Sequence, residues 1–282
     1  MKKITRRSFM AAAGLTVAAL ALTACGGSSS TASSAAASSV ASSAAASSEA
    51  ASAAATELTT VEAGKLTMAT NAAFPPYEMT TDAGEFEGID IETAQAIADK
   101  LGLELQIDDM DFDAALLSVQ QGKADIAMAG VTVTDERKAV MDFSDSYATG
   151  IQSIIVPEGS DITSPDDLAG KKIGTQRGTT GYIYCSDDFG DDAVVAYDDG
   201  LTAVQALNNG QVDAVVIDNA PAKEFVAANP GLVILDTSYA EEDYAIGLAK
   251  GSALEDAVNA ALEELKADGT LQSIVDKYIT AE

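Results

Sequence analysis

The sequence contains no histidine and no tryptophan, and only two of its 282 residues are cysteine. Without histidine there is no imidazole to activate a thiol, so a catalytic cysteine is disfavoured. Positive charge is also scarce, because 16 lysine and arginine residues stand against 44 acidic ones and give a formal net charge of −28. A surface this acidic repels nucleic acid and anionic membranes, and we exclude nucleic-acid binding.

The N-terminus has the pattern of an export signal. A basic start precedes an apolar run from Phe9 to Leu22, which is too short for a stable membrane span but suits a signal peptide. The run ends in Leu-Thr-Ala-Cys-Gly-Gly, which resembles the lipobox of bacterial lipoproteins. We therefore predict a signal peptide over residues 1–24 and a lipid on Cys25. Whether the paired arginines, Arg6 and Arg7, mark twin-arginine export or an ordinary secretory signal stays open.

Removal of residues 1–24 takes away four positive charges and leaves a net charge of −32. If Cys25 carries lipid, Cys185 has no partner for an intramolecular disulfide and is expected to be a core or surface thiol. Residues 25–60 consist almost entirely of serine, alanine, glycine and threonine after the cysteine. Such a segment cannot bury a core, so we predict a flexible tether with a reach on the order of 30 Å.

From Lys65 onward, strand and helix patterns alternate. Strands are predicted at 66–70, 103–107 and 125–129, with helices at 91–101, begun by Asp90, and at 113–121. A second series begins after an extended segment at 150–157, and its helix-to-strand junction at 208–215 repeats the pattern at 120–127. The alternation predicts an α/β fold of two similar lobes, with 150–157 and 244–249 as the strands between them.

Residues 129–137, Ala-Gly-Val-Thr-Val-Thr-Asp-Glu-Arg, follow a predicted buried strand and lead into a helix capped by Thr134. Ligands bind beyond the carboxyl ends of strands in open α/β sheets, so this segment is expected at a crevice. Gly130 permits a close backbone approach. Arg137 suits a carboxylate ligand, which a guanidinium binds with two parallel hydrogen bonds. The alternative is a structural arginine paired with Asp135 or Glu136 on the helix surface.

The ordered set of motifs along residues 65–280 resembles the extracellular solute-binding proteins of polar amino acid ABC transporters, family 3. The matching blocks are Thr70–Glu78, Gly88–Glu92, Met110–Asp113, residues 129–137, Asp142–Tyr147, Gly178–Thr180, Asp213–Asp218 and Asp268–Leu271. The resemblance implies a periplasmic-binding-protein-like fold of type II, with two α/β lobes joined by two crossing strands. It places lobe 1 at 61–149 plus 246–282, and lobe 2, including the hinge strands, at 150–245.

The resemblance also implies the binding residues. Arg137, the backbone of Gly130 and Thr132 and the Thr132 hydroxyl would hold the ligand α-carboxylate, with further donors from Thr179 and Thr180 at a helix start. Asp218 would take the α-ammonium, although an aspartate after a strand is commonly a helix cap. The rings of Phe74 and Phe112 would enclose the ligand side chain. Asn71 and Gln176 would contact it.

Specificity is less sharply indicated. Relatives that bind basic amino acids often carry an acid near the Asn71 position, which is neutral here. Arg177 could meet an acidic side chain, but on a strand it should point away from Gln176. We therefore expect a free polar amino acid with a neutral or basic side chain, no cofactor and no metal.

The resemblance further implies an ABC permease as partner and a monomer on the extracellular face of the cell membrane, held by the lipid on Cys25 alone. Two other protein classes are the alternatives. The same fold resembles dehydratases acting on prephenate-like substrates, which would show turnover. A receptor's sensing domain would be expected to continue into a membrane or signalling segment after Glu282.

Overall fold

The computed structural model describes residues 58–279. The predicted signal peptide, Cys25 and nearly all of the predicted tether lie outside the described residues. The elements described below belong to one unit of the chain, residues 55–282. None of the helices within 58–279 is long and apolar enough to cross a membrane.

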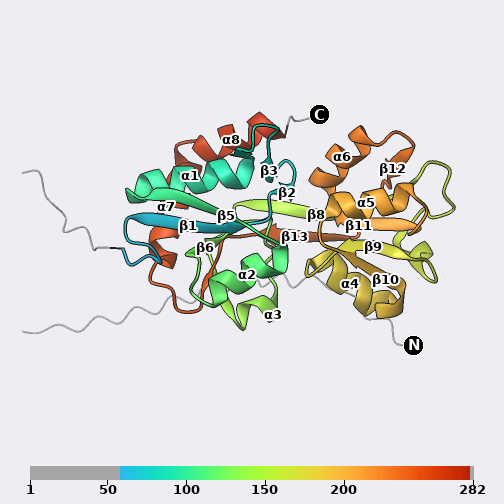
Figure 1. The fold of residues 1–282 in the computed structure, drawn as a ribbon, viewed down its shortest axis with the longest axis horizontal. Coiled ribbons are helices and arrows are strands. Elements are labelled where there is room, and N and C mark those ends of the chain that lie inside the picture. Colours follow the sequence, from blue (N-terminus) through green and yellow to red (C-terminus); the bar gives the residue numbers. More distant parts are fainter. Residues whose placement is uncertain (1–57, 280–282) are drawn as a thin grey trace, which may run out of the picture. The chain divides into compact units, whose positions relative to one another are not determined.

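The first sheet has five strands in the order β5-β1-β6-β14-β7 (Figure 1). Strand β1 pairs in parallel with β5 and with β6, and β14 runs antiparallel to β6 and β7. Its strands are β1 (Lys65–Thr70), β5 (Glu104–Asp109), β6 (Ile126–Ala127), β7 (Met141–Phe143) and β14 (Gly247–Ala249). A separate small sheet, which the sequence patterns did not predict, consists of β2 (Ala73–Phe74), β3 (Glu78–Thr80) and β4 (Phe86–Glu87).

Helices cover both faces of the first sheet. Successive side chains of β1 point to opposite faces, so each face contributes apolar side chains to a core under its own helices. Leu66 and Met68 are buried in one core cluster that includes residues of three helices on their side of the sheet, whereas Ala69 belongs to a second cluster with residues of a helix on the other side. The helices on the first side are α1 (Ile89–Leu101), α7 (Glu255–Ala267) and α8 (Thr270–Tyr278). On the other side lie α2 (Phe112–Gln120) and the short α3 (Asp135–Lys138).

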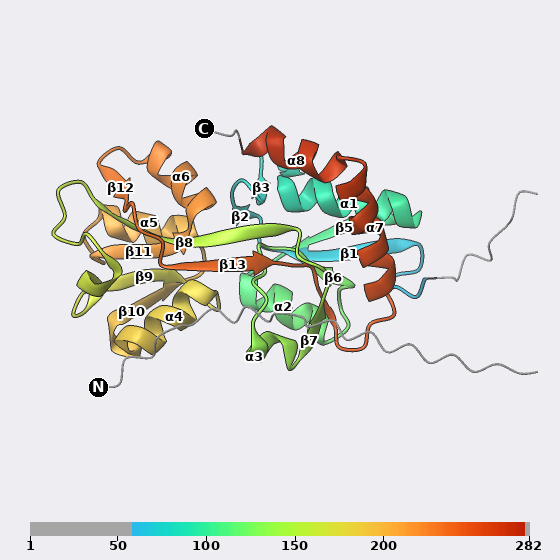
Figure 2. The same cartoon turned by 180° about the vertical axis from the view of Figure 1, so that it is seen from behind.

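The second sheet has the order β10-β9-β11-β8-β12, with β13 also paired to β8 (Figure 2). Its strands are β8 (Ala148–Pro157), β9 (Ile173–Gln176), β10 (Val194–Tyr197), β11 (Ala214–Asp218), β12 (Leu232–Ile234) and β13 (Ala240–Tyr244). The α-helices packed on it are α4 (Thr180–Phe189), α5 (Gly200–Asn208) and α6 (Asn219–Ala228), with 3₁₀ turns η1 (Pro165–Leu168) and η2 (Asp191–Ala193).

Side chains alternate in the same way on the second sheet. On β11, Val215 belongs to the same core cluster as Leu66 and Met68 and is buried there with residues of α5 and α6, whereas Val216 is buried with Cys185 of α4 in a separate cluster. Cys185 is therefore a core thiol. Two α/β lobes result, as the sequence pattern predicted.

Two strands of the second sheet, β8 and β13, run side by side and extend toward the first sheet in both views (Figures 1 and 2). The first agrees with the predicted extended segment at 150–157. The second corrects the prediction, because residues 240–244 pair with β8, whereas Gly247–Ala249 join the first sheet. The run Ala-Glu-Glu-Asp looks like surface, yet its alternating burial turns Glu242 and Tyr244 inward.

The predicted start of the helix at 91–101 also needs correction. The helix begins at Ile89 after Gly88, and it ends at Gly102, whose φ of 69° is left-handed. Asp90 is not its cap. Its buried carboxylate instead accepts the Gly130 N–H at 3.0 Å and the Tyr147 hydroxyl at 2.7 Å, which ties the start of α1 to the segment after β6.

Candidate functional site

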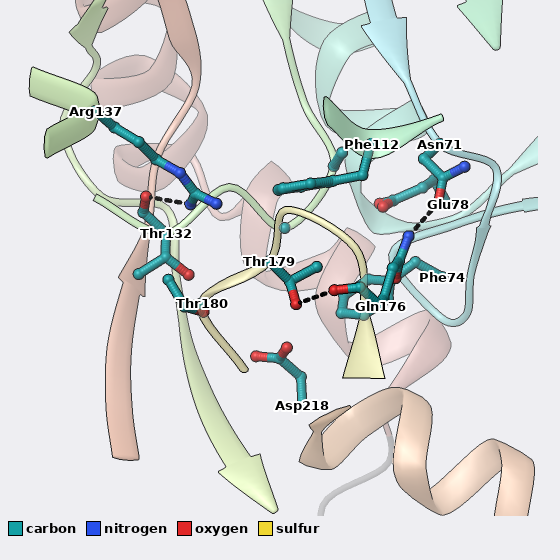
Figure 3. Close-up of a pocket in the computed structure, with 12 residues that line it drawn as sticks. Asn71, Phe74, Glu78, Phe112, Thr132, Arg137, Gln176, Thr179, Thr180 and Asp218 are labelled. Atoms are coloured by element: carbon teal, nitrogen blue, oxygen red, sulfur yellow. Dashed lines mark hydrogen bonds between the residues drawn. The ribbon is translucent and has the colours of Figure 1, made fainter. Parts of the chain in front are cut away.

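A cavity lies where the carboxyl ends of the parallel strands of both sheets face each other (Figure 3). It contains about 300 Å³ of space that atoms do not fill, part of it open to solvent. The ten residues predicted from the sequence all line it, as do two that were not predicted, Glu78 and Ala129. The predicted set is Asn71, Phe74, Phe112, Gly130, Thr132, Arg137, Gln176, Thr179, Thr180 and Asp218.

Arg137 comes from α3, whose N-cap Thr134 accepts the Arg137 N–H, as predicted. Its side chain is only 8 % exposed, whereas Asp135 and Glu136 are exposed. The guanidinium donates to the carbonyl of Thr132 at 2.8 Å and to the carbonyl of Gly178, in the other lobe, at 3.1 Å. The surface ion pair considered as the alternative is therefore absent, and a buried cation faces the cavity.

Asp218 ends β11 and occupies the N-cap position of α6, but its side chain makes no capping hydrogen bond. The carboxylate accepts instead from the Tyr244 hydroxyl and, at 2.7 Å, from the Gln152 amide. Burial raises the pKa of Asp218 to about 7, and the charge of Glu242 acts in the same direction. The aspartate is thus held at the cavity by the two connecting strands rather than used as a helix cap.

Glu242 is a buried acid that the sequence patterns did not reveal. One of its carboxylate oxygens accepts from the hydroxyls of Thr132 and Thr180, at 3.0 and 2.9 Å, and from the Gln152 amide at 3.0 Å. The protons of these two hydroxyls are therefore directed toward Glu242 and away from the cavity. Toward the cavity, the two hydroxyl oxygens can only accept hydrogen bonds. This changes the role expected for the Thr132 hydroxyl, because a carboxylate ligand needs donors.

The start of α4 supplies donors of another kind. The Thr179 hydroxyl accepts the Tyr182 N–H and donates to the Gln176 carbonyl at 2.8 Å, so it acts as a cap. Thr180 is the first helical residue, and N–H groups in the first turn have no intrahelical acceptor. An anion at this end is favoured by those N–H groups and by the helix dipole.

Two aromatic rings form walls of the cavity. Phe112, the first residue of α2, is 5 % exposed and packs in the core, so it is a core residue and a lining residue at once. The Arg137 guanidinium lies 5.3 Å from its ring centre. Phe74 lies against Gly130. Glycine is favoured there for two reasons: the φ of 54° is left-handed, and a Cβ would approach Phe74 to 2.9 Å.

Asn71 and Gln176 meet across the lobes, with the Gln176 amide donating to the Asn71 carbonyl oxygen at 2.8 Å (Figure 3). Arg177 points away, as expected for its strand position. It is exposed, lies 3.6 Å from Asp198 and does not line the cavity. A cation for an acidic ligand side chain is therefore not supplied by Arg177.

The model of one protein family, the bacterial extracellular solute-binding proteins of family 3, matches residues 66–281. The L-cystine-binding protein TcyJ of Escherichia coli (strain K12) is 33 % identical over 226 residues, covering 78 % of this chain and 85 % of that protein.

Two solved structures are also similar: an ancestral arginine-binding protein bound to arginine and one bound to glutamine. They are 42 % and 41 % identical, with TM-scores of 0.73 and 0.74, and each match covers 77 % of this chain and 98 % or 99 % of the other. These relatives are binding proteins, which supports a binding protein and not the dehydratase alternative.

Proposed function

The chain belongs to the bacterial extracellular solute-binding proteins of family 3, and from this premise we propose that it captures one free amino acid between its lobes. One observation carries the proposal. A buried cation from one lobe, Arg137, and a buried anion from the other, Asp218, face the same cavity. A zwitterion is the small solute whose two charges complement both.

We assign the α-carboxylate to Arg137 and to the N–H groups at the start of α4. The α-ammonium would donate to Asp218 and to the outward lone pairs of the Thr132 hydroxyl, whose own proton goes to Glu242. The side chain would then lie between Phe74 and Phe112. The ligand side chain is expected to be neutral or basic, in keeping with relatives named for cystine and arginine.

Binding would close the lobes, because only a closed cleft brings both charged groups to one ligand. The hydrogen bonds from Arg137 to Gly178 and from Gln176 to Asn71 already join the lobes and would form part of the closed state. The paired strands β8 and β13 would serve as the hinge. The closed form would deliver its cargo to an ABC permease.

Attachment to the membrane is a separate part of the proposal. The lipobox-like sequence before Cys25 supports lipidation at that cysteine, with residues 26–60 as a tether on the extracellular face. The protein would work as a monomer near its permease. Replacing Cys25 by alanine should release the protein from the membrane fraction, and unchanged membrane association would refute the anchor.

A thermal-shift screen against the twenty amino acids tests the function. The protein is first freed of bound solute by unfolding and refolding. A ligand present at 100 times its Kd should stabilise the folded state by about 2.7 kcal/mol and raise Tm by several degrees. If no amino acid raises Tm and none binds in calorimetry, amino acid capture is wrong.

A further inference from the structure

Glu78 is the one charged lining residue that the proposed ligand contacts leave unused. It begins β3, faces Phe74 across the small sheet and is fully buried. Figure 3 places it on the same side of the cavity as Asn71, opposite Arg137. It therefore lies where the side chain of the bound amino acid would end.

Neither carboxylate oxygen of Glu78 accepts a hydrogen bond from any group within residues 58–279. The carboxyl of Asp90 lies beside it but offers no donor unless one of the two acids keeps a proton. A buried carboxylate without donors is costly to the folded state. Asp90, in contrast, receives the Gly130 N–H and the Tyr147 hydroxyl.

The two acids are therefore unequal. Burial raises the pKa of Asp90 to about 6, while its two donors hold it down. Burial also raises the pKa of Glu78, and there the charge on Asp90 adds to the effect while neither oxygen has a donor among the described residues. Glu78 is thus the member of the pair that lacks a partner among residues 58–279.

We propose that Glu78 is the counter-charge for the ligand side chain, and that the ligand is an amino acid whose side chain carries a cationic group, with a guanidinium as the best fit. This inference rests on the proposed function. Among the lining residues, Arg137 is the one cation, and Asp218 and Glu78 are the acids. Once Arg137 and Asp218 match the α-carboxylate and α-ammonium, a third ligand charge of positive sign neutralises Glu78.

The shape of the cavity supports a planar cation. The rings of Phe74 and Phe112 line the space that leads to Glu78, and guanidinium groups stack on aromatic faces. A guanidinium also brings five N–H donors in a flat fork, enough for both oxygens of Glu78. A primary amide brings only two N–H donors and no charge, so it would leave the charge of an ionised Glu78 uncompensated.

The test compares L-arginine with L-citrulline, which has nearly the same shape but no charge. Calorimetry on the solute-free wild-type protein should show arginine binding at least tenfold more tightly. In Glu78→Gln the ratio of the two affinities should fall toward one, mainly because arginine binding weakens by tenfold or more. Glu87→Gln, an exposed acid on the neighbouring strand β4, is the matched control and should keep the wild-type ratio.

The outcomes distinguish amino acid capture from the narrower proposal that Glu78 binds a cationic side chain. If wild-type protein binds citrulline or glutamine as tightly as arginine, the cationic ligand is wrong while amino acid capture stands. An unchanged ratio in Glu78→Gln would also overturn the role of Glu78. If no amino acid binds at all, the proposed function itself fails. Should Glu78→Gln not fold, the wild-type ratio alone still decides the ligand class.

Discussion

The two ends of the cavity are constructed differently. At the end with Arg137 and Asp218, the protein supplies partners for each charge: two carbonyls for the guanidinium, and a tyrosine hydroxyl and an amide for the carboxylate. At the other end, Glu78 receives no donor from the described residues. The first end is preorganised for groups that every amino acid carries. The second is completed only by the ligand, and it is there that identity is decided.

The largest loss is expected from Arg137→Ala. Truncating one partner of a buried charge pair costs about 2 to 5 kcal/mol, or roughly 30-fold to several thousand-fold in Kd. All amino acid ligands should be affected alike, because the α-carboxylate is common to them. Calorimetry measures the loss, and Lys138→Ala, which removes an exposed charge from the same helix, is the control. Near-normal affinity in Arg137→Ala would remove this residue from the site.

Asp218→Asn should follow, with a loss of about 1.5 to 3 kcal/mol, or roughly 10- to 150-fold, since a hydrogen bond to a charged group is lost. The amide can still accept from Tyr244, so the fold should persist. Asp192→Asn, an exposed residue of the same lobe, should bind normally. A loss confined to one ligand would contradict contact with the common α-ammonium.

Acidification should weaken binding through the same residue. The pKa of Asp218 is about 7 before an ammonium arrives, so affinity should fall by about tenfold per unit below pH 7. Asp90, with its raised pKa, and Glu78 titrate near the cavity too. The contribution of Asp218 is therefore the part of the pH dependence that disappears in Asp218→Asn.

The stability of the solute-free protein should change in the opposite sense. The folded-state pKa of Asp218 is raised above its value in an unfolded chain, so its contribution is fully present at low pH and is lost as pH rises through about 7. Denaturant unfolding between pH 5 and pH 8 measures this. The advantage of wild type over Asp218→Asn should shrink with rising pH, and a growing advantage would contradict the buried carboxylate.

Glu242→Gln should cost less, about 1 kcal/mol or roughly fivefold in Kd, because it disturbs the hydroxyls of Thr132 and Thr180 without touching the ligand. The exposed neighbour Glu241 gives the matched control, Glu241→Gln. A loss above about 100-fold would mean that Glu242 itself contacts the ligand.

The smallest effect is expected where the lobes meet. Asn71→Ala removes one cross-lobe hydrogen bond and should speed ligand release a few-fold, with little change in association. Stopped-flow measurements of ligand release provide the rates. Because Gln176→Ala breaks the same bond, the double variant should release ligand no faster than either single one. Additive effects would show that each residue acts alone.

Much of the first end of the cavity could be predicted from sequence, because its residues sit in ordered blocks at strand ends. The segment 129–137 carries its glycine, hydroxyl, cap and arginine within nine positions, and the structure places Gly130, Thr132 and Arg137 on one cavity. Strand ends in an open α/β sheet converge, so local order in the chain translates into a site.

The acids that complete the cavity could not be found in this way. Glu78 and Glu242 look like members of a large acidic surface, and only tertiary pairing buries them. The alternation of buried and exposed residues along β13 puts Glu242 on the same side as Tyr244. In the sequence this pattern is too short to recognise, because the neighbours of Glu242 are also acids. The prediction for Asp90 is wrong for a related reason. An aspartate near a helix start is usually a cap, and only tertiary contacts give Asp90 its other role.

The position of β14 has a consequence for how the molecule assembles. This strand fills the gap between β6 and β7, yet the whole second lobe separates it from both in the chain. The second sheet is made from one continuous stretch, Ala148–Tyr244, and can form as soon as that stretch has left the ribosome or translocon. The first sheet must wait for a long-range contact, which is slow. In pulsed hydrogen exchange during refolding, the amides of β9 and β11 should therefore become protected before those of β7. The first sheet, which begins earlier in the chain, would be completed last, when β14 pairs with β6 and β7.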